Sequence, residues 1–228
     1  MEIAGIEKFS LVDYPGEVCC VLFLKGCNFR CGFCHNPQLV IPQKTPLYSN
    51  EKILEFLEKR KNKLTGVCIT GGEPLLSIEK NFLRQIKELG YKIKIDTNGS
   101  NPNRLKELIG EGLVDYVAMD IKGAKELYKE ITNSKVDIEK IEESIKTISK
   151  LPGHEFRTTV LKKFHTKKTI TSMVSWLKKT IGSNPKAIYL QAFKNTGALL
   201  DPKFNKGKNT PESYLKEVSK DYRFIKIR

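Results

Sequence analysis

Short apolar runs alternate along the chain with amphipathic stretches. Six runs predict strands, because they are short, rich in β-branched and aromatic residues, and bounded by turn residues. The predicted strands are residues 18–24, 67–70, 92–95, 116–121, 155–161 and 187–193. Between them, apolar residues recur every three or four positions, which predicts helices. The predicted helices are 50–60 with Asn50 as cap, one from a Ser77 cap to about Leu89, one opening at Asn101 and Pro102, 138–149 and 169–181.

Strands that alternate with helices indicate parallel pairing and right-handed crossovers. A complete eight-fold barrel takes about 250 residues, whereas this chain has 228 residues and six strand–helix units. We therefore expect an α/β fold in which parallel strands form an incomplete, TIM-like (βα)6 barrel with an open side. A flat doubly wound sheet is the alternative.

The segments that flank these units follow other patterns. Residues 1–16 read as a short lead-in ending in a Pro-Gly turn, and a polar linker runs through Pro46. Beyond the last strand come a loop rich in Gly, Lys and Asn (194–209), a helix capped by Thr210 and Pro211, and an edge strand within 222–227. No repeat or clear linker divides the chain, so we expect one domain, residues 1–228, with its core at about 17–193 and an extension at about 194–228.

Residues with chemical potential follow successive predicted strands. Three cysteines come after the first strand, and Gly71-Gly72-Glu73-Pro74 after the second. Asp96-Thr97-Asn98-Gly99 ends the third strand, and Asp120 and Lys122 close the fourth. The carboxyl ends of parallel barrel strands share one rim, where active sites form. We therefore expect these residues to share a site.

The cysteines are Cys27, Cys31 and Cys34, in the spacing C-x-x-x-C-x-x-C. Thiolates are the ligands that iron–sulfur clusters prefer, and most cubane clusters use four cysteines. Three local ligands would leave one iron open, and an open metal position can bind a small molecule. Three alternatives are a structural zinc site completed by His35, c-type haem attachment at C-x-x-C-H, and a disulfide. The last two go with export, and no export signal is apparent.

Each of the other candidates also has a purely structural interpretation. Gly71-Gly72 could be only a tight turn, although two glycines also let backbone groups approach a ligand closely. Glu73 adds an anion for an amine, while Thr97-Asn98-Gly99 is by itself an ordinary turn sequence. Asp120 and Lys122 point to the same face of a strand and could form a salt bridge.

Several further residues are less informative. Arg157 and Gln191 lie on the last two strands, either as satisfied interior polar groups or as site residues. The remaining cysteines, one methionine and the tryptophan are expected in the core, and two histidines in loops with no catalytic role. These are Cys19, Cys20, Cys68, Met173, Trp176, His154 and His165.

Composition narrows the class of protein. Hydrophobic residues make up 39% and charged residues 29%, as in soluble globular proteins. We see no signal peptide and no transmembrane run, so we expect a cytoplasmic protein. The net charge is +14, but the lysines are spread along predicted helices without interleaved aromatics. A solvated basic surface is therefore favoured over an acidic protein partner, and nucleic-acid binding is the least supported.

The cysteine motif followed by Gly71-Gly72-Glu73-Pro74 resembles the radical S-adenosylmethionine (SAM) superfamily, over about residues 3–193. The amino-acid sequence of residues 26–37 is also similar to that of the activating enzymes of glycyl radical enzymes. Within them, the chain most resembles the activase of anaerobic ribonucleoside-triphosphate reductase in its longer form. The further segments that carry this resemblance are Ser10 to Gly16, Asp96 to Gly99, Met119 to Lys122 and Phe156 to Thr159.

The resemblance implies roles for named residues. Cys27, Cys31 and Cys34 would hold a 4Fe–4S cluster whose fourth iron is chelated by the amino and carboxylate groups of SAM. The implied cofactor-binding residues are Phe33, His35, Gly71, Gly72, Glu73, Asn98, Asp120 and Lys122. Asp96 and Asp120 would also hold a monovalent cation, as in the formate-lyase activase. That activase has a histidine after its sixth strand, where this chain has Lys194.

The resemblance further implies a reaction and partners. Reduced flavodoxin or ferredoxin would supply an electron, and SAM would be cleaved to methionine and a 5′-deoxyadenosyl radical. That radical would remove hydrogen from a glycine of a partner glycyl radical enzyme, for which an open barrel side leaves room. There are two rival hypotheses. In the first, the chain uses the same cofactor but acts on a small molecule or a nucleoside. In the second, the chain is a zinc or iron–sulfur binding module and not an enzyme.

Overall fold

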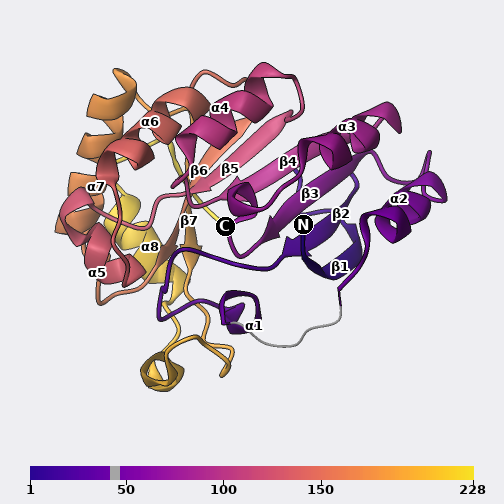
Figure 1. Cartoon of the computed structure of the whole chain (residues 1–228). Coiled ribbons are helices and arrows are strands. Elements are labelled where there is room, and N and C mark those ends of the chain that lie inside the picture. Colours follow the sequence, from indigo (N-terminus) through magenta and orange to yellow (C-terminus); the bar gives the residue numbers. More distant parts are fainter. Residues whose placement is uncertain (42–46) are drawn as a thin grey trace. The chain divides into compact units, whose positions relative to one another are not determined.

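The computed structural model describes residues 1–41 and 47–228, which fall into two compact units (Figure 1). The first unit comprises Met1–Asn28, Gln38–Thr97 and Asn103–Val117. The second unit comprises Phe29–Pro37, Asn98–Pro102 and Ala118–Arg228. Each unit is described below by itself.

The strands belong to one eight-stranded sheet whose order follows the chain, β1 to β8. Their bounds are β1 Ile3–Ser10, β2 Cys19–Leu24, β3 Gly66–Gly71, β4 Lys92–Thr97, β5 Tyr116–Asp120, β6 His154–Val160, β7 Ile188–Ala192 and β8 Ile225–Ile227. In the first unit β2 pairs with β3, and β3 with β4, in parallel; in the second unit β6, β7 and β8 also pair in parallel. The α/β class with parallel strands is confirmed, as are the six predicted core strands and the edge strand.

The lead-in predicted for residues 1–16 is wrong, because Ile3–Ser10 forms β1, antiparallel to β2. Only Ile3 and Ser10 are buried in this strand, so it lacks the continuous apolar run that marks the other strands. The predicted Pro-Gly turn does join β1 to β2, with Gly16 at φ +82° and the Glu17 amide donating to the Tyr14 carbonyl at 3.1 Å.

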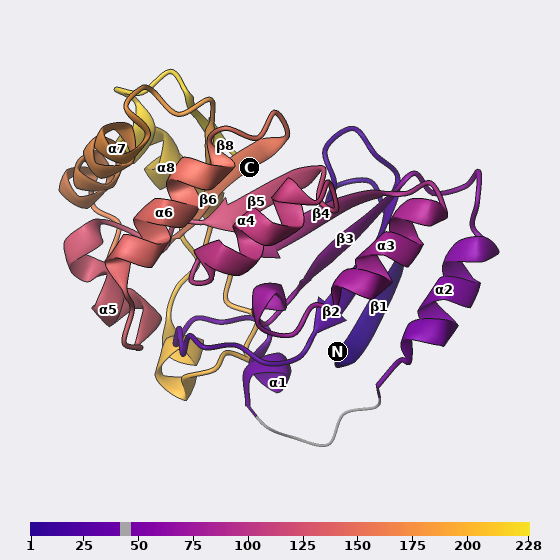
Figure 2. The same ribbon diagram turned by 45° about the horizontal axis from the view of Figure 1, so that its top comes forward.

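The helices of the first unit begin with α1 (Pro37–Val40), within the predicted polar linker, whose residues 42–46 lie outside the described chain. The others are α2 (Asn50–Glu58), α3 (Lys80–Glu88) and α4 (Pro102–Gly110). Figures 1 and 2 show α2 and α3 side by side over the β2–β4 part of the sheet. Their buried apolar residues are Ile53 and Leu57 on α2 and Phe82, Leu83 and Ile86 on α3.

Two predicted helix caps in this unit are wrong. Ser49, not Asn50, caps α2, since its side chain accepts from the Lys52 amide at 3.3 Å. Ser77 does not begin α3, because a short 3-10 turn, η1 (Pro74–Leu76), intervenes and Glu79 precedes the helix. The turn forms there because the Glu73 side chain accepts from the Leu75 amide and Pro74 fits the first helical position.

The helices of the second unit are α5 (Tyr128–Thr132), α6 (Ile138–Ile148), α7 (Lys167–Ile181) and α8 (Glu212–Ser219), with 3-10 turns η2 (Lys125–Leu127) and η3 (Pro202–Lys206). Helix α7 contacts both α6 and α8 (Figure 2). Met173 and Trp176 on α7 are buried, as predicted. The predicted Thr210 cap of α8 is wrong, because its hydroxyl donates to the Val160 carbonyl at 2.8 Å instead. His154 is the first residue of β6, so the loop predicted for it is also wrong.

Candidate active site

The Gly71-Gly72-Glu73 turn lies against the start of the cysteine loop, within the first unit. The amide of Gly72 donates to the Leu24 carbonyl at 2.8 Å, and the amide of Glu73 donates to the Gly26 carbonyl at 2.7 Å. A Cβ atom on Gly72 would lie 1.9 Å from the Gly26 oxygen and 3.3 Å from Cys27 Cβ. The glycine therefore permits a backbone contact that no other residue allows. This close approach holds the end of β3 beside the first cysteine.

Glu73 is completely buried and held in a fixed orientation. Its Oε1 accepts from the Leu75 amide at 3.2 Å and from the Thr97 hydroxyl at 2.7 Å. The hydroxyl comes from the end of β4, so two strand ends jointly orient one carboxylate. A carboxylate oriented in this way can accept hydrogen bonds from an ammonium group, the role that the resemblance implies for Glu73.

The rest of the cysteine loop belongs to the second unit. The Cys34 amide donates to the Cys31 carbonyl at 3.0 Å, which closes a turn between the two thiols. Arg30 anchors the start of this segment, because its amide donates to the Thr132 carbonyl and the Ser134 hydroxyl, both at 3.0 Å. Cys31 and the Phe33 ring are buried, with 8% and 5% exposed.

His35 orders the end of this loop. Its Nε2 donates to the Lys194 carbonyl at 2.6 Å, and its ring stacks on Phe193 with centroids 5.8 Å apart. These contacts order the end of the cysteine loop, and they fix the carbonyl of Lys194 against it.

Asp120 and Lys122 form the salt bridge that their spacing predicts, with 3.0 Å between Lys122 Nζ and Asp120 Oδ2. Arg157 approaches the other carboxylate oxygen at 3.3 Å, so it has a charged partner, and this partner is itself a predicted site residue. Burial opposes ionisation of Asp120, but the ammonium and the guanidinium outweigh it and lower its pKa to about 2. Burial also opposes protonation of Lys122, yet Asp120 and Cys31 raise its pKa. This ion pair stays charged over the whole physiological range.

The backbone of Lys122 is held by hydrogen bonds with the side chains of His165 and Tyr128. His165 Nε2 donates to the Lys122 carbonyl at 2.9 Å, and the Leu161 amide donates to His165 Nδ1 at 3.0 Å. Burial lowers the pKa of this histidine. The Tyr128 hydroxyl accepts from the Lys122 amide at 3.3 Å. His165 does lie in a loop, as predicted, but it is buried and supports a predicted site residue.

One charged group was missed at the level of the sequence. Lys94, in the middle of β4, is 1% exposed and forms an ion pair with Asp96. Its Nζ also lies 3.6 Å from the thiol of Cys68, the residue that pairs with Lys94 on the neighbouring strand β3. Burial raises the pKa of Cys68 well above its usual value, so this cysteine is a core thiol, as expected. The sequence carries no clear signal for it, because β4 reads Lys-Ile-Lys-Ile-Asp-Thr, and such alternation is typical of a strand whose lysines face solvent.

The predicted site residues are distributed over both units. Cys27, Gly71, Gly72 and Glu73 belong to the first, and Cys31, Phe33, Cys34, His35, Asn98, Asp120 and Lys122 to the second. Asn98 is 6% exposed, and its side chain accepts from the Ser100 amide at 2.9 Å. Within residues 1–41 and 47–228, no preformed group of three or more Cys, His, Asp or Glu side chains could hold a metal ion. The ligand assignment therefore stays a prediction.

The donor set fits an iron–sulfur cluster. None of the six cysteines, which all lie within the described residues, forms a disulfide. The Nε2 of His35 holds the Lys194 carbonyl, which leaves its Nδ1 as the nitrogen that a metal could use. Three thiols, with a backbone turn packed closely behind the first, match a cluster that leaves one iron to a small ligand.

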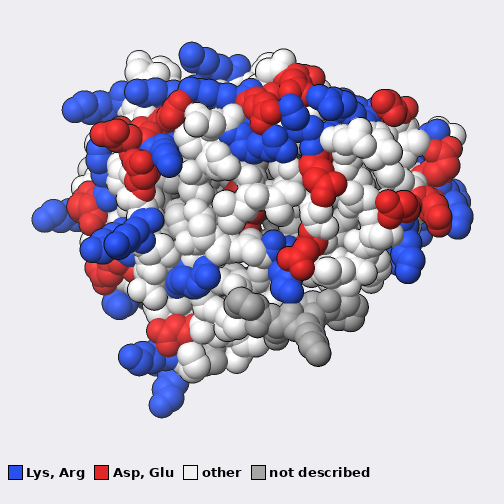
Figure 3. All heavy atoms as spheres, in the orientation of Figure 1, with Lys and Arg blue, Asp and Glu red and all other residues white. Residues whose placement is uncertain are grey.

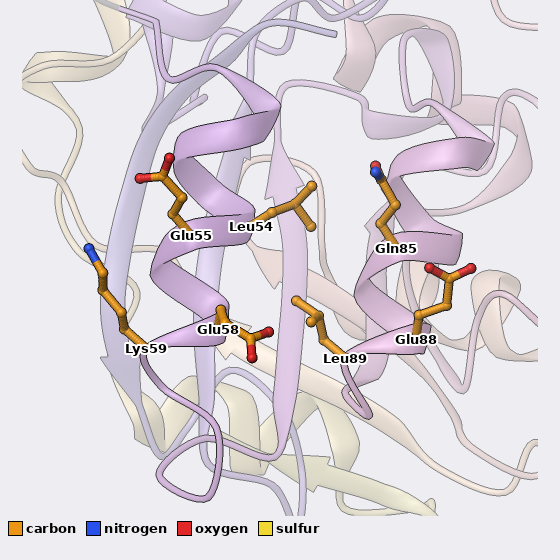
Figure 4. Close-up of a pocket in the computed structure, with 7 residues that line it drawn as sticks. All are labelled: Leu54, Glu55, Glu58, Lys59, Gln85, Glu88 and Leu89. Atoms are coloured by element: carbon orange, nitrogen blue, oxygen red, sulfur yellow. The ribbon is translucent and has the colours of Figure 1, made fainter.

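Other surface features do not involve these residues. A groove between α2 and α3 is lined by Leu54, Glu55, Glu58, Lys59, Gln85, Glu88 and Leu89 (Figure 4). None of the predicted site residues is among them.

On the face shown in Figure 3, lysines and arginines are interspersed with acidic residues, as expected for a solvated basic surface. In the described part of the chain, no helix is long and apolar enough to cross a membrane.

The chain is similar to known proteins along most of its length. The model of the Radical SAM superfamily matches residues 21–177. A relative from Methanocaldococcus jannaschii, provisionally named a glycyl-radical enzyme activating enzyme, is 32% identical over 227 residues, covering 96% of this chain and 90% of that protein. The pyruvate formate-lyase-activating enzyme of Clostridium pasteurianum is 35% identical over 126 residues, covering 53% of this chain and 52% of its own.

Two further comparisons bear on substrate and fold. The 7-carboxy-7-deazaguanine synthase of Methanothermobacter thermautotrophicus is 31% identical over 102 residues, covering 44% of this chain and 40% of the synthase. The crystal structure of Streptococcus suis SuiB bound to the precursor peptide SuiA superposes with a TM-score of 0.64 at 15% identity, covering 91% of this chain and 48% of SuiB. The second likeness shows the fold alone and agrees with the predicted incomplete barrel.

Proposed function

The chain belongs to the radical SAM superfamily, and from this premise we propose that it activates a glycyl radical enzyme. One observation carries the proposal. Similarity to the archaeal relative named for this activity covers nearly all of both proteins, whereas similarity to the deazaguanine synthase covers less than half of either. A relative that shares only the cofactor would be expected to match mainly in the cofactor-binding part.

We propose that Cys27, Cys31 and Cys34 hold the 4Fe–4S cluster and that SAM binds beside it. When bound and reduced, this centre supplies the reductive cleavage of SAM, which yields methionine and a 5′-deoxyadenosyl radical. The chain's own residues hold the cofactor, orient it and exclude water and oxygen. Acid–base chemistry is not required of them.

Glu73 is proposed to hold the amino group of SAM. Its carboxylate is buried and turned by Thr97 and Leu75, so it can receive an ammonium without reorganising. Gly71 and Gly72 bring backbone groups close to the same end of the cofactor. Asn98, Asp120 and Lys122 are proposed to line its ribose and carboxylate side. Phe33 and the cysteine-loop backbone are proposed to contact the adenine, and His35 to contact the cofactor.

The finer assignments follow from the resemblance. We propose anaerobic ribonucleotide reductase as the partner, a reduced flavodoxin or ferredoxin as the electron donor, and the cytoplasm as the location. The resemblance also predicts a monovalent cation on Asp96 and Asp120. Each of these carboxylates has a cationic partner, Lys94 or Lys122, so a metal ion there would share it with a side chain.

The test uses the whole chain after anaerobic reconstitution with iron and sulfide. The reduced protein is incubated with SAM and purified anaerobic ribonucleotide reductase, and 5′-deoxyadenosine and the glycyl radical are measured by chromatography and electron paramagnetic resonance. We expect both products, their loss in Cys31→Ala, and their retention in Cys20→Ala, since Cys20 is a buried cysteine outside the motif.

Two other outcomes would each select a rival. Cleavage of SAM with no protein radical, but turnover of a nucleoside-like metabolite, would favour the activity class of the deazaguanine synthase. Zinc in place of iron, with no SAM cleavage, would favour a binding module.

A further inference from the structure

The loop between β7 and α8 packs onto the cysteine loop, and both segments belong to the second unit. The loop, residues 194–209, is the gold segment at the bottom of Figure 1. Its two ends meet, because the Thr210 amide donates to the Phe193 carbonyl at 2.9 Å. A surface loop with adjoining ends and its own internal packing is an Ω-loop.

Two consecutive amides of this Ω-loop hold the cysteine loop. Leu200 donates to the Cys34 carbonyl at 3.2 Å, and Asp201 donates to the Gly32 carbonyl at 2.9 Å. The two acceptors lie on either side of Phe33. The Ω-loop thus fixes the backbone between the second and third predicted ligands.

Phe204 completes the contact by occupying the space above Gly32. A Cβ atom on Gly32 would lie 2.6 Å and 2.9 Å from two carbons of the Phe204 ring. The Phe204 ring also packs on Phe33, with centroids 6.3 Å apart. Gly32 separates Cys31 from Phe33, so the ring covers the backbone between two buried residues of the motif.

The Ω-loop is itself held in shape by Asn195. The side-chain amide of Asn195 donates to the Gly207 carbonyl at 2.8 Å, and its oxygen accepts from the Gly197 amide at 2.8 Å. The backbone amide of Asn195 donates to the side-chain oxygen of Asn209 at 2.7 Å. One side chain therefore ties the beginning of the loop to its end. Because of this, the amides of Leu200 and Asp201 are presented in a fixed geometry.

We propose that the Ω-loop braces the cluster-binding loop, with Phe204 as a positioning residue that slows loss of the cluster. This inference rests on the proposed function, since it assumes that Cys31 and Cys34 are cluster ligands. Side chains behind metal ligands commonly change metal retention by about tenfold or more when removed.

The experiment compares Phe204→Ala with Lys206→Ala, an exposed residue of the same loop, after anaerobic reconstitution. Iron per chain, the rate of cluster loss to a ferrous chelator, and the melting temperature of the metal-free chain are measured. We expect Phe204→Ala to load iron normally but to lose it roughly tenfold faster, with an almost unchanged melting temperature. Lys206→Ala should behave as the wild type. Phe204→Leu, which keeps an apolar side chain, replaces the alanine variant if truncation disturbs folding.

A double-mutant cycle separates bracing from general destabilisation. Gly32→Ala should lose the cluster quickly, because its methyl group meets the Phe204 ring. Adding Phe204→Ala should partly restore retention, since the obstruction is then removed. Equal loss rates in wild type and Phe204→Ala, or no rescue in the double variant, would overturn the brace while leaving the proposed function intact. Failure of the wild type to take up iron would overturn the proposed function itself.

Discussion

The hydroxyl of Thr97 donates a 2.7 Å hydrogen bond to the carboxylate of Glu73, although Thr97 ends β4 and Glu73 follows β3. Both are buried, with 3% and 0% exposed. The bond therefore sets the direction of a carboxylate that has no access to water. Loss of this hydrogen bond should mainly lower the affinity for a cationic ligand.

Thr97→Val removes this hydroxyl at nearly constant volume. A hydrogen bond to a charged group contributes about 1.5–3 kcal/mol, so we expect weaker SAM binding, by roughly tenfold or more. Thr97→Ser keeps the hydroxyl and is the matched control. Equilibrium binding of SAM to the reconstituted protein measures the effect; equal affinities in the valine and serine variants would contradict it.

Lys94→Met should destabilise the first unit. Breaking a buried ion pair by removing one partner costs about 3–5 kcal/mol, and Lys94 forms such a pair with Asp96. Denaturant unfolding followed by circular dichroism provides the measurement. The double variant Lys94→Met/Asp96→Asn should recover part of the loss, because neither charge then remains. A double variant as unstable as the sum of the two single variants would contradict the pairing.

Arg228 should stabilise the second unit through Glu155. Its two guanidinium nitrogens each donate to a separate carboxylate oxygen at 3.0 Å, and the guanidinium lies over the Tyr189 ring at 4.1 Å. Arg228 is partly exposed, so solvent screening limits the gain, and we expect Arg228→Ala to cost about 1–2 kcal/mol. Arg228→Lys keeps the charge but not the bidentate geometry, so its stability should lie between those of the wild type and Arg228→Ala. If lysine restored full stability, the geometry would be irrelevant.

The stability of the chain should fall as the pH drops below about 6.5, the usual pKa of histidine. Burial lowers the pKa of His165 in the folded state, so between its lowered value and its usual one only the unfolded chain takes up the proton. Denaturant unfolding at pH 7.5 and pH 5.5 measures the difference. His165→Gln should show a smaller pH dependence than the wild type. His154→Gln, at a half-buried histidine whose pKa is also lowered by burial, should remove less of it.

Most strands could be predicted from the sequence, because a buried parallel strand is a continuous apolar run with turn residues at its ends. The antiparallel β1 could not, since only its first and last residues are buried and it lacks such a run. The caps at Ser49 and Glu79 were missed for another reason. A short 3-10 turn or a one-residue shift in a cap leaves no mark in the hydrophobic period.

The candidate site was predictable where it depends on order along the chain. Glu73 follows β3 and Thr97 ends the neighbouring parallel strand β4, so topology alone predicts that they lie near each other in the first unit. That Glu73 and Asp120 share a rim stays a prediction. Contacts that depend on packing could not. The hydroxyl of Thr97 on Glu73 and the ring of Phe204 over Gly32 join residues far apart in the chain, and no local spacing encodes them.

The contact between Gly72 and Gly26 has a consequence for sequence variation. A methyl group at position 72 would overlap the oxygen of residue 26, only 1.9 Å away. A library with every amino acid at that codon should therefore return glycine alone among clones that fold and keep this backbone course. A natural homologue carrying alanine there would have to route its polypeptide differently between the second strand and the first cysteine.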